Sequence, residues 1–205
     1  KVATPPHIVD KSTKLETIFD RIDLIKTRME LLKKDAEINF LKRKLKQVKD
    51  LSFDDKYKKE IEKIDSDMEF LEKCNIGGEF MDPSSQSRVT SIGNKKVSIF
   101  GKKQNFLSKD EIQNLNITKG TLLPDEREII NDHIVITIEM LEQLPYPKHL
   151  KNVPEFAGGH HEKMDGTGYP KGLDSEQMST QAKIMAIADI YEALTAADRP
   201  YKDGK

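Results

Sequence analysis

Apolar residues recur alternately three and four positions apart over the first part of the chain. They are Leu15, Ile18, Ile22, Ile25, Met29, Leu32 and Ala36. This heptad spacing places them along one face of an α-helix. Thr13 and Glu16 have the spacing of a capping box, which predicts that the helix begins there. The pattern falters at Asn39 and then resumes, so the helix is predicted to continue to about Lys49 with a local change of face.

A second apolar stripe follows and ends at a pair of glycines. Its residues are Tyr57, Ile61, Ile64, Met68 and Leu71, and Gly77 with Gly78 predicts its end. The two stripes together predict an antiparallel helical hairpin. The first helix, of roughly 36 residues, would be about 54 Å long, whereas the second, of roughly 21 residues, would reach only about 31 Å. Part of the first helix therefore needs another surface to pack against.

Two explanations of that unmatched length stay open. A protein partner or a homodimer through the heptad helix at 13–48 would cover it, and so would a further domain upstream. Alternatively, the hairpin packs entirely on its own domain, because heptads alone do not fix an oligomeric state.

The remaining sequence predicts short helices separated by loops. Between residues 82 and 108, proline, serines and a Gly-Asn pair predict loops, with one small β-hairpin around 97–100. Four further helices are predicted to begin at Ser108, near Pro124, at Val153 and near Ser179. The second of these is predicted to run to Leu144, and a glycine-rich loop at 165–172 precedes the last, which runs to about Ala196. The fold class is therefore predicted to be all-α.

Composition excludes several functional classes. Hydrophobic residues make up 36% of the chain and charged residues 34%, and no apolar run approaches the roughly 20 residues of a membrane-spanning helix. We therefore predict no membrane segment, and no signal-like sequence argues for export. A net charge of -1 gives no reason to expect binding to a nucleic-acid polymer. The single cysteine, Cys74, fits a reducing, cytoplasmic compartment and excludes cysteine-rich zinc sites.

The segment from His160 to Pro170, HHEKMDGTGYP, carries the densest candidate chemistry. Adjacent histidines on an α-helix point roughly 100° apart, so they suit two neighbouring metal ions better than one. Asp189 lies in an apolar stretch of a predicted helix, where a carboxylate is costly unless a cation is beside it. With His133, which also lies in a helical pattern, these residues would suit two-metal phosphoryl chemistry. The donor types favour iron, manganese, nickel or zinc over calcium.

The histidines also have a simpler interpretation, without a metal ion. A histidine pair on its own is more often a surface feature or a satisfied core pair than a metal site. His7 and His149 lack candidate ligands in their surroundings and are interpreted as surface residues.

Several segments resemble one known family. HHEKMDGTGYP resembles the HHExxDGxGYP signature of HD-GYP phosphohydrolases, and AIADIYEALTAADRPYK resembles the ADxxDALTxxRPY block that follows it. The stretch from Lys119 through Glu126 to His133 resembles the family's approach to its middle histidine. The first residues, KVATP with Ile8 and Val9, are similar to those that follow the family's His-Asp dyad.

The resemblance implies three segments. Residues 1–12 would follow the His-Asp dyad, which would lie just upstream of Lys1. Residues 13–118 would be an inserted helical hairpin with loops and carry no family motif, and residues 119–205 would form the HD-GYP core. The implied fold is an all-α, HD-domain-like helical bundle, truncated at both ends, with the large insertion and one short β-hairpin.

The resemblance also implies a set of site residues. The metal ligands would be His133, His160, His161 and Asp189. Lys1 would contact the scissile phosphate as a catalytic residue, and the substrate would be bound by Tyr169, Pro170, Arg199 and Lys202. Asp165 and Glu192 would support the ligands without binding metal, with Glu192 standing where the family has Asp.

The implied activity is hydrolysis of cyclic di-GMP to a linear dinucleotide or GMP, with two or three divalent metal ions. Lacking part of the site, this chain would be inactive alone. One alternative is a signalling module on the same scaffold that binds a nucleotide or a protein without cleavage. Another is a metal site that acts on a nucleotide monophosphate or an alarmone.

Overall fold

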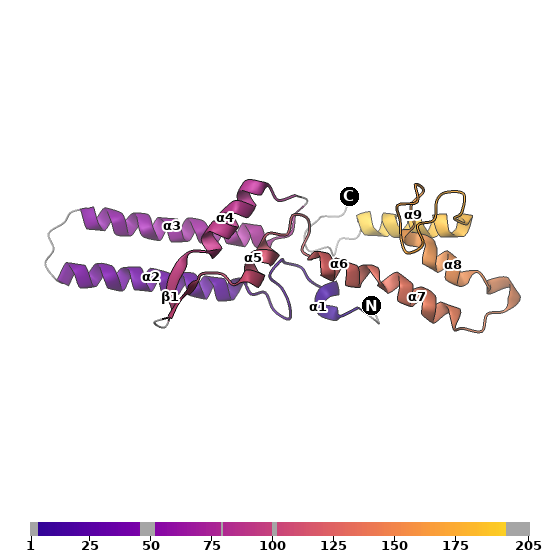
Figure 1. Ribbon diagram of the computed structural model, residues 1–205, viewed down its shortest axis with the longest axis horizontal. Helices are drawn as coiled ribbons and strands as arrows, with labels where there is room; N and C mark the ends of the chain where they lie inside the picture. The colour runs from indigo at the N-terminus through magenta and orange to yellow at the C-terminus, as the bar shows by residue number, and fades with distance from the viewer. Residues whose placement is uncertain (1–3, 46–51, 79, 100–101, 196–205) are drawn as a thin grey trace. The chain divides into compact units, whose positions relative to one another are not determined.

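The computed structural model describes residues 4–45, 52–78, 80–99 and 102–195 (Figure 1). The chain divides into two compact units. We call residues 11–123 the hairpin unit, and the described residues of 1–10 and 124–205 the histidine unit. The hairpin unit is thus inserted in the sequence of the histidine unit. Among the described residues, no helix is long and apolar enough to cross a membrane.

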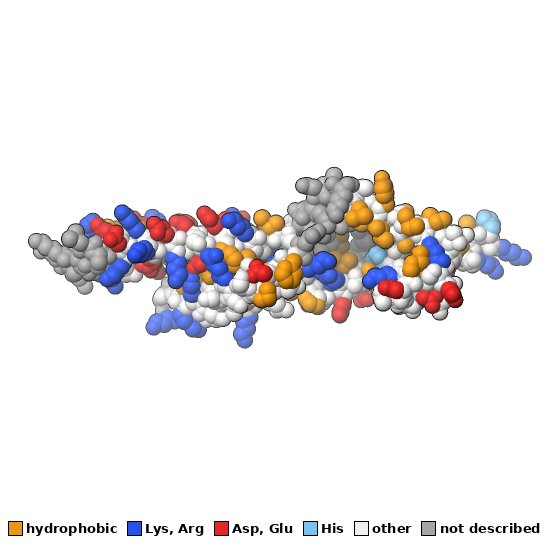
Figure 2. Space-filling view, turned by 90° about the horizontal axis from the view of Figure 1, so that it is seen from above, with side chains coloured by type: hydrophobic (Ala, Val, Ile, Leu, Met, Phe, Trp, Pro, Cys, Tyr) orange, Lys and Arg blue, Asp and Glu red, His pale blue; other side chains and the backbone are white. Residues whose placement is uncertain are grey.

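The hairpin unit is built around two long helices, α2 (Ile22–Leu45) and α3 (Ser52–Asn75), which lie side by side (Figure 1). They confirm the predicted helical hairpin. The other elements of this unit are α4 (Pro83–Gly93), β1 (Lys96–Ile99), β2 (Lys102–Asn105) and α5 (Lys109–Leu115). The two strands pair antiparallel, as predicted, with Lys96 opposite Asn105. On the side of the long hairpin seen in Figure 2, where α3 lies, charged side chains predominate.

The predicted start of the first helix was wrong, because α2 begins at Ile22 rather than at Thr13. The Glu16 carboxylate does accept a hydrogen bond from the backbone N–H of Thr13 (3.1 Å), but the hydroxyl of Thr13 donates to Asp20 (2.8 Å). Asp20 also accepts from the backbone N–H of Ile22 (2.9 Å). The polar residues therefore close a turn ahead of the helix, and the capping group at the helix start is Asp20.

Helix α4 lies where loops were predicted. The Asp82 side chain accepts a hydrogen bond from the backbone N–H of Ser85 (2.9 Å), and Pro83 occupies the first turn. Both features are typical of a helix start. By contrast, the capping box of Ser108 and Glu111 was predicted and is present at the start of α5.

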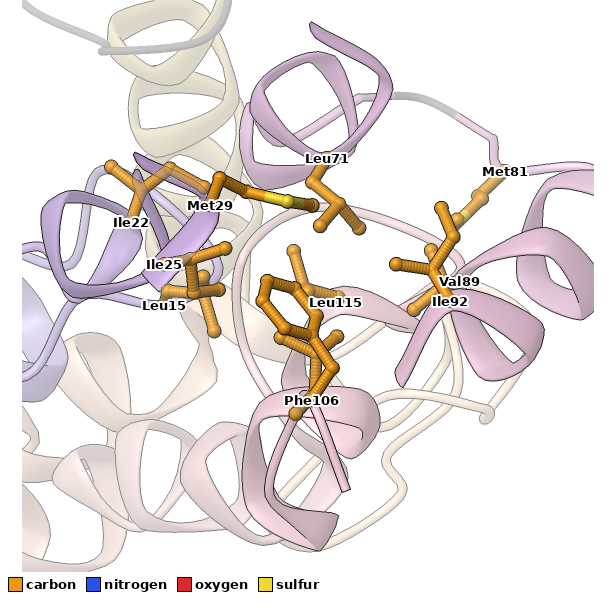
Figure 3. Close-up of a cluster of buried hydrophobic side chains, with 11 residues drawn as sticks. Leu15, Ile22, Ile25, Met29, Leu71, Met81, Val89, Ile92, Phe106 and Leu115 are labelled. Atoms are coloured by element: carbon orange, nitrogen blue, oxygen red, sulfur yellow. The ribbon is translucent and has the colours of Figure 1, made fainter. Parts of the chain in front are cut away.

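The core of the hairpin unit joins residues from all of its helices (Figure 3). Its buried members are Leu15, Ile22, Ile25, Met29, Leu71, Met81, Val89, Ile92, Phe106, Leu107 and Leu115. Beside this core, Arg28 forms a salt bridge with the buried Glu111. Burial opposes ionisation of Glu111, but hydrogen bonds from Arg28 and from the Ser108 backbone outweigh it and lower the pKa of the carboxyl group.

The two ends of the hairpin unit are tied to each other. The hydroxyl of Thr121 donates a hydrogen bond to the carbonyl oxygen of Lys11 (3.1 Å). The Lys11 ammonium group in turn donates to the side chain of Asn114 (3.1 Å). The chain therefore leaves this unit close to where it enters.

The histidine unit has only helices and no strands among the named elements of its described residues. Its elements are α1 (Pro6–Val9), α6 (Pro124–Asn131), α7 (His133–Glu142), the 3-10 helix η1 (Lys148–Leu150), α8 (Val153–Gly158), the 3-10 helix η2 (Gly159–His161) and α9 (Thr180–Thr195). The single helix predicted from Pro124 to Leu144 is divided at Asp132, whose ψ of -13° departs from the helical value. The last helix and the loop before it are as predicted. With one pair of short strands in the hairpin unit, the described chain is mostly helical, which confirms the predicted class.

Candidate metal centre

Three histidine side chains meet within the histidine unit. His133 begins α7, whereas His160 and His161 end η2. One ring nitrogen of each lies within 4.8 Å of the others, and all three residues are half-buried. The closest pair is Nε2 of His161 and Nε2 of His133, at 3.2 Å. Sequence reasoning favoured separate ions for the adjacent histidines, but their donor atoms lie close enough to share one cation.

Backbone carbonyl groups orient two of the imidazoles. Nδ1 of His133 is 2.5 Å from the carbonyl oxygen of Ile130, and Nδ1 of His160 is 2.6 Å from that of Ala157. Because a carbonyl can only accept, each Nδ1 carries the hydrogen and each Nε2 presents a lone pair. This is the usual arrangement of a metal-binding histidine, whose second nitrogen is held by an outer hydrogen bond. The short contact between Nε2 atoms is favourable when a proton or a metal ion lies between them.

The charge state of His161 suits the same role. Burial, with a smaller effect of the neighbouring His160 and His133, lowers its pKa to about 4 against the opposing effect of Asp189. The ring is therefore neutral near pH 7. Neutral imidazole is the form that binds a metal ion.

The predicted ligand Asp189 lies on α9 and is exposed. It is outside the group of three close nitrogen donors. Its charge nevertheless acts on His161 and on Tyr169, whose pKa is raised by burial and by Asp189. Asp189 therefore faces the histidine cluster electrostatically, and its role as a ligand stays a prediction. Glu192, also predicted to act here, is exposed further along α9.

Three predicted site residues, Lys1, Arg199 and Lys202, lie outside the described residues. Their roles stay predictions.

Glu162 organises the loop that follows the histidine pair, a role that sequence reasoning did not assign. Its buried carboxylate accepts hydrogen bonds from the backbone N–H groups of Lys171 (2.7 Å) and Leu173 (2.8 Å). The loop also passes so close to Glu162 that a Cβ at Gly168 would lie 2.5 Å from the Glu162 Cα. Only glycine fits there without a backbone shift. The available signal was the position of Glu162 within HHExxDGxGYP.

The same loop places Tyr169 against a candidate ligand. The Tyr169 ring stacks on His161 with centroids 4.9 Å apart, and its hydroxyl donates a hydrogen bond to Asn131 (3.2 Å). Pro170 follows and is exposed. Asp165 accepts hydrogen bonds from the backbone N–H (3.0 Å) and hydroxyl (2.7 Å) of Thr167, which lower its pKa. Asp165 thus acts on the shape of the loop, whereas Tyr169 contacts the histidine cluster directly.

Replacing Glu162 with alanine is expected to loosen this loop. Two partly buried backbone donors would lose a charged acceptor, at a cost of roughly 1–3 kcal/mol in local stability. Amide hydrogen exchange at Lys171 and Leu173 would then quicken by roughly tenfold to a hundredfold. Glu176→Ala, at an exposed position of the same loop, is the matched control and should leave these rates unchanged. Equal protection in both variants would show that Glu162 does not hold the loop.

Comparison with known proteins places this site in a family. Residues 109–205 match the HD domain family. A 3'3'-cGAMP-specific phosphodiesterase 3 of Vibrio cholerae is 39% identical over 83 residues, which are 40% of this chain and 17% of that protein. A cyclic di-GMP phosphodiesterase of Thermotoga maritima is 38% identical over 86 residues, 42% of this chain and 23% of that protein. The matches thus span no more than about a quarter of these relatives.

Together, the helical fold, the histidine cluster and the matched segment define an HD domain. Within HD domains, the HHEKMDGTGYP sequence resembles the signature of the HD-GYP group. A cyclic di-GMP phosphodiesterase of Pseudomonas aeruginosa is 58% identical over 45 residues, which are 22% of this chain and 11% of that protein. Residues 109–205 match the HD domain family, and the cyclic-dinucleotide phosphodiesterases similar to this segment support the resemblance to HD-GYP phosphohydrolases found in the sequence.

Proposed function

We propose that this chain carries the metal-binding part of a phosphodiesterase that hydrolyses cyclic di-GMP. The observation that supports this most is the convergence of His133, His160 and His161, whose ring nitrogens lie within 4.8 Å beside the loop that carries Tyr169. The names of the relatives include both cyclic di-GMP and 3'3'-cGAMP phosphodiesterases, which supports a cyclic dinucleotide as the substrate class.

The three imidazoles would hold a divalent iron, manganese, nickel or zinc ion, with Asp189 adding a negative ligand. A metal ion bound there would lower the pKa of a coordinated water and so supply hydroxide near neutral pH. Tyr169 would orient His161 by stacking on it and present its outer edge to the nucleotide. Glu162 would keep that loop in place through its two backbone hydrogen bonds. Lys1, Arg199 and Lys202 would bind phosphate or guanine.

The test combines binding and turnover measurements on the chain extended upstream by roughly a hundred residues, because the present chain is expected to be inactive alone. Calorimetry with cyclic di-GMP and chromatography of its products are carried out on metal-loaded, chelated and reloaded protein. We expect chelation to remove binding and hydrolysis together, and reloading to restore them. Asp189→Asn should weaken both by about a hundredfold, because it removes a charged ligand. Asp125→Asn, at an exposed position of α6, should match the unchanged protein. Hydrolysis that survives chelation, or no binding in any state, would contradict the proposal.

One observation favours a second candidate function, in which the chain binds the nucleotide without cleaving it. The close donors among the described residues are three imidazoles, and Asp189 is not one of them. A centre without a carboxylate ligand would offset less of the metal charge. Affinity for cyclic di-GMP that persists after chelation, with no product formed, would establish this alternative.

A further inference from the structure

Helix α2 carries a second apolar face that points away from the core. Five large apolar side chains on this helix are between 42% and 82% exposed: Leu24, Leu31, Ile38, Leu41 and Leu45. All except Leu41 are spaced seven residues apart, so they lie in line along the helix. We call these five residues the outer stripe.

The outer stripe is distinct from the heptad stripe that predicted a partner in the sequence. Ile22, Ile25 and Met29 of that earlier stripe are buried in the core of the hairpin unit. On a helix with 100° per residue, the outer stripe lies on nearly the opposite side. Helix α2 is therefore apolar on two faces, although one of them is enough to pack it against α3.

Helix α3 provides an internal comparison. It has the same length as α2, 24 residues. In its described side chains, no large apolar residue is exposed. Its outer side is covered by charged residues (Figure 2). Among the described side chains of these two helices, large exposed apolar residues therefore occur on α2 and not on α3, and a regular line of them marks an interaction surface.

We infer that the outer stripe packs against the same stripe of a second copy of this chain, with the two α2 helices antiparallel. A seven-residue repeat fits a partner helix that has the same repeat, and the same helix of a second copy meets that condition. The four aligned positions are symmetric about the point between Lys34 and Asp35. A twofold axis at that point places Leu24 opposite Leu45 of the second copy, and Leu31 opposite its Ile38.

The charges along α2 determine the direction. Its first turn carries Asp23, and its last turn carries Lys42, Arg43 and Lys44. An antiparallel pair places the acidic end of one helix near the basic end of the other, and Lys34 near Asp35 of the second copy. A parallel pair would bring six cations together at one end and place Lys34 beside its own equivalent. Electrostatics therefore favours the antiparallel arrangement.

The oligomeric state of the whole chain tests this inference. Sedimentation equilibrium over roughly 1–100 µM is expected to show a dimer whose dissociation constant falls within that range. The double variant Leu31→Glu with Ile38→Glu should raise the dissociation constant by at least about tenfold, because it places like charges at the centre of the stripe. Ile76→Glu is the matched control, since Ile76 is 61% exposed but lies outside α2, and it should dimerise normally. Circular dichroism verifies that each variant is folded.

Cysteine pairing tests the direction separately. In a Cys74→Ser background, Leu31→Cys combined with Ile38→Cys should give a disulfide-linked dimer on mild oxidation, whereas Leu31→Cys alone should not. A parallel pair would reverse the second result and overturn the antiparallel arrangement. A wild-type chain that is monomeric throughout the concentration range would overturn the inference. Unchanged dimerisation of the folded double glutamate variant would also overturn it.

Discussion

Replacing His161 with alanine is expected to lower the affinity of the chain for divalent metal by on the order of a hundredfold or more. The reason is geometric. Nε2 of His161 lies 3.2 Å from Nε2 of His133, and a nitrogen of His160 lies within 4.8 Å of both. Removal of the His161 ring leaves two imidazole donors, and it also takes away the ring on which Tyr169 stacks. Loss of one ligand should therefore affect both the ion and the adjoining loop.

Metal content measured by mass spectrometry after dialysis, and titration with Mn²⁺ or Zn²⁺ in a calorimeter, would quantify this loss. His149→Ala is the matched control, because His149 is an exposed histidine of η1 outside the cluster. The control should bind metal like the unchanged chain. Equal affinity in the two variants would mean that the histidine cluster does not hold the ion.

Replacing Phe106 with alanine is expected to destabilise the hairpin unit by about 3–5 kcal/mol. Phe106 is only 1% exposed and lies at the centre of the core cluster (Figure 3). The substitution removes a ring that is buried in the core cluster and leaves a cavity that the surrounding residues can only partly fill. The Arg28 guanidinium group, 5.7 Å from the ring centroid, would lose that contact as well.

Urea denaturation followed by circular dichroism measures the free energy of unfolding. Phe80→Ala is the control for this prediction, because Phe80 is 75% exposed. Its substitution should change stability by no more than about 0.5 kcal/mol. A loss at Phe106 no larger than at Phe80 would show that the core tolerates the cavity.

Periodicity predicted the long hairpin correctly but not where its first helix begins. The stripe from Ile22 to Ala36 has the period of a helix and forms one, as expected. Thr13 and Glu16 have the spacing of a helix start, but the hydrogen bond from the Thr13 backbone N–H to the Glu16 carboxylate closes a turn instead. The Thr13 hydroxyl donates to Asp20 and so does not cap a helix. Sequence spacing cannot separate these outcomes, because both satisfy the same backbone groups. The apparent change of face after Asn39 arises because Leu41 and Leu45 belong to the exposed outer stripe, which begins at Leu24.

The sequence predicts those residues of the candidate site that can be recognised by their residue type and their position in a motif. His133, His160 and His161 could be named because their residue type and their place in a motif are visible in the sequence. The function of Glu162 could not be found in the same way, since its partners are backbone N–H groups of Lys171 and Leu173. Every residue except proline has such a group, so no pattern of side chains reveals which ones a carboxylate will contact.

The hydrogen bond between Thr121 and Lys11 holds the two ends of the hairpin unit together. A flexible insertion of about a hundred residues would impose an entropic penalty on the segments that flank it, roughly 3 kcal/mol more than a tight turn. Because the inserted unit has its own core and brings its two ends together, most of that penalty disappears once it has folded. The folded insertion therefore acts as a short connection between the two segments of the histidine unit. Its length can change with little effect on the stability of that unit.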